Sequence, residues 1–153
     1  MNTFETDAAF VAHTYARFPV EIVGGKGSVL TGSDGKSYID LGSGIAVNTL
    51  GVCDAGWIKA VTDQLHRFGH TSNLYYSAPC ANLAAELCAR TGMQKVFFSN
   101  SGAEANECAV KAARAYGAAK HGADCYTILT LKNSFHGRTL TTLAATGQDA
   151  FHE

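Results

Sequence analysis

The residues best suited to chemistry lie between an apolar run at 96–98 and a helix expected to begin near Gly102. Residues 99–101 are small and polar, so the chain turns before that helix starts. The first N–H groups of a helix lack partners within it, and the helix dipole places partial positive charge at that end. A phosphate group is a natural ligand for such a terminus. A plainer interpretation is also open, because Ser101 and Glu104 have the spacing of a capping box.

A second segment of similar character follows the apolar run at 127–131. Within four consecutive positions it carries the aromatic ring of Phe135, the imidazole of His136 and the guanidinium of Arg138. Two strand-to-turn units that end in ligand-binding groups are typical of the carboxyl edge of an α/β sheet. The two segments together predict a site for a phosphorylated ligand.

Composition excludes several other classes of function. Charged residues make up 16% of the 153 residues and the net charge is −1, so no basic surface for nucleic acid is expected. The chain has neither a run long enough to span a membrane nor the features of a secretory signal at its start. The cysteine count is odd and lacks a C-x-x-C pair, which predicts free thiols in the cytoplasm and no structural metal site. These thiols are Cys53, Cys80, Cys88, Cys108 and Cys125.

The order of expected elements predicts an α/β fold. Alternating residues around an Asp-Gly turn at 33–36 predict a small β-hairpin segment with strands at 20–23, 27–30 and 38–41. Helix, strand, helix, strand and helix then follow, which predicts a mainly parallel sheet covered by helices. Two strands do not complete such a sheet, so the chain is expected to be the opening portion of a larger protein and to associate when alone. The later elements are expected over 57–68, 77–91, 95–98, 102–116, 127–131 and 137–146. Ser77 and Pro79 mark the start of the helix over 77–91 and Gly92 its end, and Gly117 is expected to end the helix over 102–116.

Several motifs in the same order resemble a known family. Residues 95–107 closely resemble the phosphate-binding segment of class III aminotransferases, which are pyridoxal-phosphate enzymes of fold type I. Residues 134–139 are similar to the family's next signature, and residues 70–76 most resemble its acetylornithine branch. The resemblance implies the N-terminal part of a fold type I transferase. Residues 1–53 would contribute to the small domain, and residues 54–153 would form an incomplete first part of the cofactor-binding large domain.

The resemblance also implies roles for five cofactor-binding residues. The backbone N–H groups of Gly102 and Ala103, aided by Ser101, would anchor the phosphate group of pyridoxal 5'-phosphate. Phe135 would stack on one face of the pyridine ring. His136 would lie beside the ring as a supporting group.

Two further residues are implied to contact the substrate. Arg138 would hold a carboxylate through its two-pronged guanidinium. Tyr15 matches a position that lines the substrate pocket. Gly44 and Ile45 stand where ornithine aminotransferases place a tyrosine, so the resemblance implies an acylated substrate in preference to free ornithine.

The activity implied is transfer of an amino group from N-acetylornithine to 2-oxoglutarate, a step of arginine biosynthesis, by a cytoplasmic homodimer. No catalytic residue is assigned within the chain, because the Schiff-base lysine lies beyond residue 153 in the family. The chain alone is therefore expected to be inactive. The alternatives are another class III enzyme, acting on ornithine, succinylornithine or 4-aminobutyrate, and a non-catalytic phosphate-binding fragment.

Overall fold

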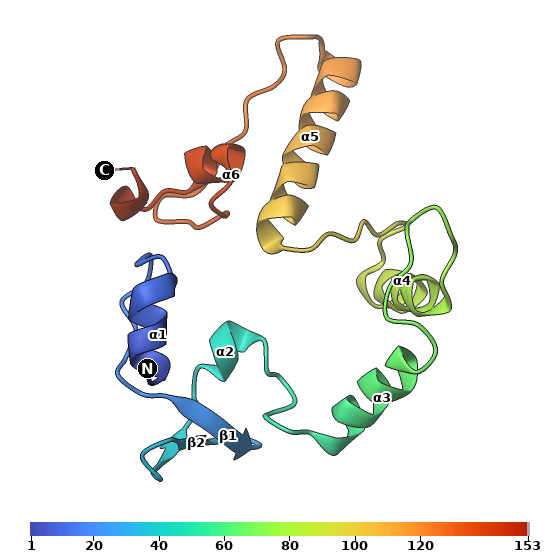
Figure 1. Ribbon diagram of the computed structural model, residues 1–153. Coiled ribbons are helices and arrows are strands. Elements are labelled where there is room, and N and C mark those ends of the chain that lie inside the picture. Colours follow the sequence, from blue (N-terminus) through green and yellow to red (C-terminus); the bar gives the residue numbers. More distant parts are fainter. Residues whose placement is uncertain (153) are drawn as a thin grey trace. The chain divides into compact units, whose positions relative to one another are not determined.

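The computed structural model describes residues 1–152. The chain divides into two compact units, Met1–Tyr75 and Tyr76–Glu153 (Figure 1). The first unit contains the only sheet found in residues 1–152, and the second contains both segments predicted to bind a phosphorylated ligand. The division expected at residues 53 and 54 concerns the domains of a larger enzyme, and it stays a prediction.

The sheet of the first unit is antiparallel and has three strands. β1 (Ile22–Lys26) pairs with β2 (Val29–Gly32), which pairs with β3 (Ser37–Ile39), in the order β1-β2-β3. Asp34 fixes the turn between β2 and β3, because its carboxylate accepts hydrogen bonds from the Lys36 N–H at 3.0 Å and the Tyr38 hydroxyl at 2.9 Å. The predicted β-hairpin is confirmed, and its first two strands begin two residues later than expected.

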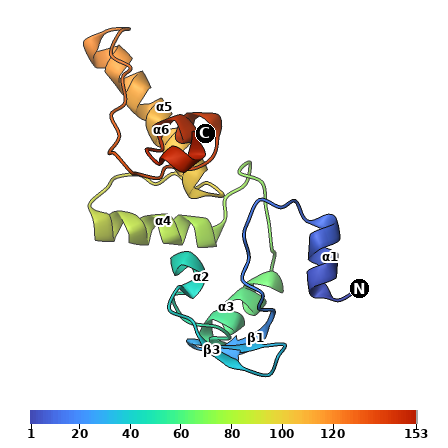
Figure 2. The same cartoon turned by 90° about the vertical axis from the view of Figure 1, so that its left-hand side faces the viewer.

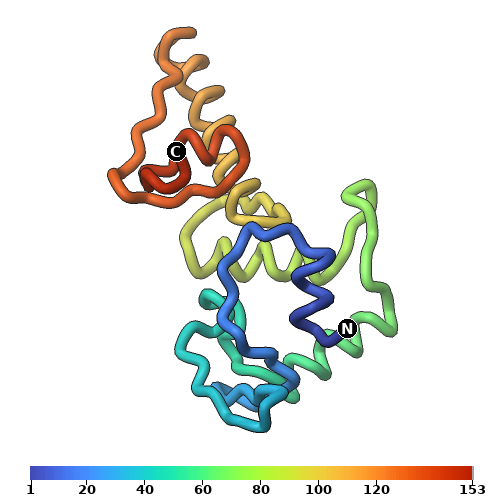
Figure 3. The backbone as a smooth tube through the Cα atoms, turned by 60° about the vertical axis from the view of Figure 1, so that its left-hand side comes forward, coloured from blue at the N-terminus to red at the C-terminus, as the bar shows by residue number. Residues whose placement is uncertain are grey.

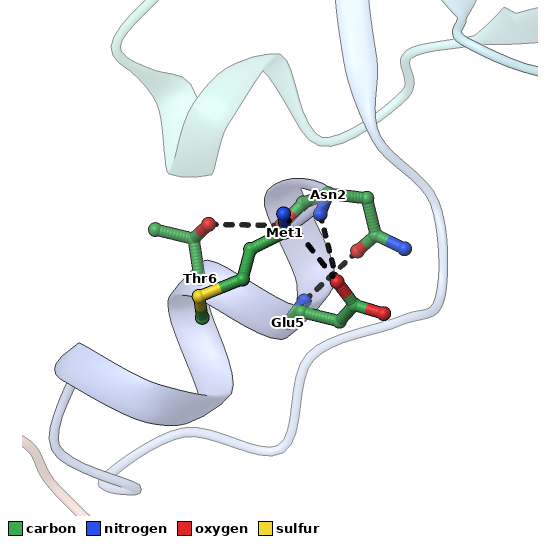
Figure 4. A network of polar contacts seen from close by, with 4 residues as sticks. All are labelled: Met1, Asn2, Glu5 and Thr6. Carbon is green, nitrogen blue, oxygen red and sulfur yellow. Dashed lines mark hydrogen bonds and ion pairs between the residues drawn. The ribbon is translucent and has the colours of Figure 1, made fainter.

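The two longer helices of the first unit begin at side-chain caps. In α1 (Thr3–Phe10), the Asn2 side chain accepts from the Glu5 N–H, and the Glu5 carboxylate accepts from the Asn2 N–H, both at 2.9 Å (Figure 4). In α3 (Ala55–Leu65), Asp54 accepts from the Trp57 N–H at 2.7 Å. The sequence predicted α3 but not α1, although a capping box is a recognisable start signal.

A single unusual turn, α2 (Ser43–Ala46), lies between the sheet and α3. All four residues have positive φ, from 47° at Ser43 to 61° at Gly44. Residues that carry a Cβ atom reach this conformation at a cost of about 1–3 kcal/mol each. Asp40 helps to hold the turn, since its carboxylate accepts from the Ser43 N–H at 2.8 Å.

Three helices form the framework of the second unit: α4 (Ala78–Thr91), α5 (Gly102–His121) and the short α6 (Leu140–Ala145). A 3₁₀ turn, η1 (Asp149–Phe151), follows them. After α5 the chain turns back along the helix, so that α6 contacts α5 (Figures 2 and 3). The predicted limits of α4 are confirmed, including the left-handed Gly92 that ends it.

Two predictions for the second unit are wrong. Gly117 does not end α5 but lies buried inside it, where a Cβ atom would be 2.4 Å from the Cys125 carbonyl oxygen. Residues 95–98 and 127–131 form no strand, and the expected parallel sheet is absent from residues 1–152. A strand exists through hydrogen bonds to a neighbouring strand, and neither segment has such a neighbour in the part of the chain that the structure describes.

Apolar side chains remain exposed throughout both units. No apolar side chain is buried among residues 1–152, and Trp57, Leu83 and Phe97 are 57%, 51% and 65% exposed. The described residues therefore leave their apolar helix faces uncovered. None of the helices in residues 1–152 combines the length and the hydropathy needed to cross a lipid bilayer.

Candidate functional site

The N-terminus of α5 begins at Ser101, which has extended backbone and caps the helix. Its Oγ accepts a hydrogen bond from the Glu104 N–H at 3.2 Å. The Glu104 carboxylate accepts in turn from the Asn100 N–H at 2.8 Å, one residue before the position that a standard capping box would use. The N–H groups of Gly102 and Ala103 have no acceptor within residues 1–152. The helix terminus therefore keeps two backbone donors for a ligand.

The space in front of these donors is open. A Cβ atom added to Gly102 would meet no described atom within 4 Å. The helix behind it is 20 residues long, so its dipole is fully developed at this end. A phosphate group fits both the donors and the open space, which is what the sequence predicted for these residues. Their assignment to a bound phosphate stays a prediction.

The second predicted segment lies against the first turn of α5. Gly137 is buried, and a Cβ atom at this position would fall 2.7 Å from the Ala103 Cβ. Gly137 also has a φ of 132°, which favours glycine. The structure thus brings the turn that carries Phe135 and Arg138 directly to the helix terminus at Ala103.

Hydrogen bonds from both sides hold this turn in place. The Asn106 side chain donates from Nδ2 to the His136 carbonyl oxygen at 2.8 Å, and the His136 N–H donates to Thr146 Oγ1 at 3.1 Å. The Thr139 hydroxyl donates to Glu107 Oε1 at 2.6 Å. Sequence reasoning missed Asn106, Glu107 and Thr146, because nothing local links them to the turn. The one available signal was helical spacing, since Asn106 and Glu107 share a helix face with Ala103.

The side chains of the turn differ in their surroundings. Phe135 is 52% exposed, and its ring centroid lies 5.8 Å from that of Phe151. The Arg138 guanidinium carbon lies 5.5 Å from the same Phe151 ring centroid, a geometry that allows a cation–π contact. His136 Nε2 is buried without a hydrogen-bond partner in the described part of the chain. Phe151 is a further neighbour of the site that the sequence did not indicate.

Tyr15 belongs to the first unit, whereas the other predicted site residues belong to the second. Its ring is 59% exposed, and the Arg17 guanidinium carbon is 6.0 Å from the ring centroid. Its role in a substrate pocket stays a prediction. Across residues 1–152, no group of three or more His, Cys, Asp or Glu side chains is arranged to hold a metal ion.

Comparison with known proteins decides the family. The model of class-III aminotransferases matches residues 10–153. The chain belongs to this family. Class-III aminotransferases use pyridoxal phosphate, and a structure of the ornithine aminotransferase from Toxoplasma gondii records this cofactor at its active site. An orphaned imidazole nitrogen, two free helix-terminal donors and an exposed aromatic ring fit this cofactor's phosphate and ring.

Individual class-III aminotransferases are similar over nearly the whole chain. Acetylornithine aminotransferase from Haemophilus ducreyi is 51% identical over 149 residues, which cover 97% of this chain and 38% of that protein. The enzyme of the same name from Methanocaldococcus jannaschii is 41% identical over 152 residues, 99% of this chain and 38% of its own length. The chain thus spans 38% of the length of these curated relatives.

Solved structures of class-III aminotransferases give the same picture. N-acetylornithine aminotransferase from Stenotrophomonas maltophilia is 38% identical, with a TM-score of 0.77 over 88% of this chain and 36% of that chain. Ornithine aminotransferase from Toxoplasma gondii is 28% identical, with a TM-score of 0.90 over 98% of this chain and 36% of that chain. The chain corresponds to the N-terminal third of fold type I aminotransferases.

Proposed function

We propose that this chain is the part of an acetylornithine aminotransferase that holds the phosphate and ring of pyridoxal phosphate and the carboxylate of the substrate. The observation that supports the proposal is the close approach of Gly137 to Ala103, because it brings the turn that carries Arg138, the proposed carboxylate-binding residue, to the helix terminus proposed to bind phosphate. The names of the relatives from Haemophilus ducreyi and Methanocaldococcus jannaschii support N-acetylornithine as the amino donor.

The phosphate group would be held by main-chain donors. The free N–H groups of Gly102 and Ala103 point out of the first turn of α5, and Ser101 keeps that turn in place through its bond to Glu104. Hydrogen bonds to a charged acceptor contribute about 1.5–3 kcal/mol each. Two such bonds and the helix dipole together account for a phosphate anchor without a lysine or arginine at this spot.

The ring and the substrate would be held by the turn that follows. Phe135 offers an exposed aromatic face for stacking, and the imidazole of His136, whose buried Nε2 has no polar partner in the described residues, would lie beside the ring. Arg138 would bind the substrate carboxylate with two parallel N–H donors. When bound, pyridoxal phosphate supplies the electron sink that allows an amino group to leave one carbon and join another.

The amino group would pass from N-acetylornithine to 2-oxoglutarate, giving N-acetylglutamate semialdehyde and glutamate. We propose that the chain alone is inactive, because the family's covalent lysine comes from sequence outside the region matched here. We also propose that the complete enzyme works in the cytoplasm as a homodimer, with Tyr15 in the substrate pocket. Preference for the acylated substrate would follow from Gly44 and Ile45, since no tyrosine stands in the left-handed turn there.

A hybrid enzyme tests the substrate. In this hybrid, the chain replaces the matching residues of the Haemophilus ducreyi relative, and kcat/KM is measured for N-acetylornithine and for ornithine. The proposal expects a clear preference for N-acetylornithine. Equal or greater activity on ornithine would instead support the alternative of an ornithine aminotransferase.

Titration of the 153-residue chain with pyridoxal phosphate, followed by borohydride reduction and mass mapping, tests whether the chain binds the cofactor without bonding it covalently. The proposal expects binding with no lysine modified in stoichiometric amount. Gly102→Leu is expected to weaken that binding about tenfold or more, because its side chain would fill the open space before the donors. A stoichiometric adduct on one lysine would overturn the proposed inactivity of the chain.

A further inference from the structure

Asn106 and Glu107 link the two segments of the candidate site. Both lie in the second turn of α5, at positions three and four residues after Ala103 and therefore on its face of the helix. Ala103 is the residue that Gly137 touches. The same face of α5 thus carries a van der Waals contact and two polar side chains directed at the following turn.

The main chain of His136 is held on both sides. Its carbonyl oxygen accepts from Asn106 Nδ2 at 2.8 Å, and its N–H donates to Thr146 Oγ1 at 3.1 Å. Thr146 is only 2% exposed, so this bond lies in the best-buried part of the second unit. Phe135 immediately precedes this anchored residue, and Arg138 follows it by two positions.

A second link fixes the far end of the turn. Thr139 caps α6, and its hydroxyl donates to Glu107 Oε1 at 2.6 Å while it also contacts Thr142 Oγ1 at 2.7 Å. Thr142 is 1% exposed. The turn is therefore tied to α5 at residues 136 and 139, on either side of Arg138.

We propose that Asn106 and Glu107 are positioning residues, which fix the spacing between the phosphate-binding terminus of α5 and the ring- and carboxylate-binding side chains Phe135 and Arg138. The identity of the ligands in this inference rests on the proposed function. The hydrogen bonds that link α5 to the turn do not depend on it. In this proposal neither residue contacts the ligands, since the side chains of Asn106 and Glu107 bond to His136 and Thr139. Each acts through the backbone or the cap of the turn, so its loss should loosen the turn and leave the helix terminus intact.

Hydrogen exchange of the 153-residue chain, measured without ligand, tests the link. Asn106→Asp keeps the shape of the side chain but replaces the amide donor by a carboxylate that faces a carbonyl oxygen. Exchange at the His136 amide, which donates to Thr146 Oγ1, is expected to rise about tenfold, as the loss of one buried hydrogen bond allows. Amides in the middle of α5 and in α4 should be unchanged.

Matched variants separate the link from general damage. Asn82→Asp makes the same change in α4, at an exposed residue whose side chain has no polar partner in the described residues. It should leave exchange at the His136 amide unaffected. Glu107→Met should speed exchange at residue 139 and in the turn before it, whereas Glu107→Gln, which keeps an acceptor oxygen, should restore slow exchange.

Binding of two probes tests the positioning role. Inorganic phosphate needs the helix terminus alone, whereas pyridoxal 5'-phosphate also needs the turn. Asn106→Asp is expected to weaken binding of pyridoxal phosphate about tenfold and to leave that of phosphate within twofold of the original. A purely structural defect would weaken both probes equally.

Two results would overturn the inference: unchanged exchange at the His136 amide in Asn106→Asp, or equal weakening of the two probes. Fast exchange of the His136 amide in the unaltered chain would overturn it as well. Failure of the unaltered chain to bind pyridoxal phosphate, with the turn still protected, would count against the proposed function and leave the link standing.

Discussion

A Cβ atom on Gly137 would lie 2.7 Å from the Cβ of Ala103 and 3.1 Å from its Cα. No side chain fits at such distances unless the turn moves away from α5. Gly137 also has a φ of 132°, which residues with a Cβ rarely adopt. Because the side chain of Gly137 is a single hydrogen atom, the turn that carries Phe135 and Arg138 can reach the terminus of α5.

Gly137→Ala is therefore expected to displace the turn. Crowding at Ala103 adds about 1–3 kcal/mol, and the backbone conformation adds about 1–3 kcal/mol. The hydrogen-bonded amides of His136 and Thr139 should exchange much faster, and pyridoxal phosphate should bind more weakly. Hydrogen exchange and a binding titration measure these effects.

Gly122→Ala is the matched control for that change. Gly122 also has positive φ, 102°, but a Cβ there would meet nothing within 4 Å. It should carry the backbone cost alone and leave the turn at 135–139 in place. Equal effects of the two variants on this turn would show that the contact with Ala103 has no importance.

Ser101→Ala tests the cap of α5. Loss of a side-chain cap costs about 1 kcal/mol, so the first turn of α5 should open about fivefold more often. Ser77 is the control, because it precedes α4 but makes no side-chain cap hydrogen bond, and Ser77→Ala should have little effect. Hydrogen exchange in the two first turns gives the comparison.

A second variant at Ser101 separates capping from ligand binding. Ser101→Asp keeps an acceptor for the Glu104 N–H and should preserve the helix start. Its negative charge should nevertheless repel inorganic phosphate. If phosphate binding survived in Ser101→Asp, the terminus of α5 would not be the phosphate site.

Local signals allowed much of the fold to be predicted. The Asp-Gly turn predicted the hairpin, and Ser77, Pro79 and Gly92 predicted the limits of α4, since caps and turns depend on neighbouring residues. Gly117 was misread as a stop, because its reason for being glycine is the distant Cys125. Segments 95–98 and 127–131 were predicted as strands for a similar reason. Their apolar pattern is local and fits a strand, but a strand forms only by pairing with other strands.

Local patterns also predicted part of the candidate site. Ser101, Gly102 and Arg138 stand in recognisable local patterns, and the order of elements predicted that their two segments would meet. Asn106, Thr146 and Phe151 act on the site across long stretches of sequence, and no pattern in a single chain indicates such pairs. Residues proposed to bind the ligand were therefore easier to identify from the sequence than the residues that hold their turn in place.

The β2–β3 turn should depend on pH through Asp34. The Lys36 backbone N–H, the Lys36 side chain and the Tyr38 hydroxyl all hold the pKa of Asp34 below its ordinary value. A lowered folded pKa means that this contribution to stability is present above the ordinary aspartate pKa, about 3.9, and is lost as the pH falls through the folded value.

Tyr38 and Lys36 make the stability of the same turn depend on pH in the opposite direction. The hydrogen bond to Asp34 raises the pKa of Tyr38, and the same carboxylate raises that of Lys36. Their contributions are present at neutral pH and are lost as the pH rises through the folded values. Nuclear magnetic resonance of the hairpin should show both limits in the unaltered chain. In Asp34→Asn the acid limit should vanish, whereas Asp124→Asn, whose carboxylate has no partner in the described residues, should keep it.

Self-association of the isolated chain follows from its exposed apolar side chains. Trp57 and Leu65 on α3 are 57% and 61% exposed, and Tyr116 on α5 is 62% exposed, although each stands on a helix face with apolar periodicity. Such faces release about 25 cal/mol for each Å² of apolar surface removed from water, so contact between copies is favourable. Sedimentation of the purified chain should show species larger than a monomer, which increase with concentration.

Trp57→Lys, which places a charge in one exposed face, should shift the distribution toward monomer, whereas Lys59→Arg on the polar side of α3 should not. A monomer that unfolds in one cooperative transition would contradict this prediction, because it would require a buried core that residues 1–152 do not contain.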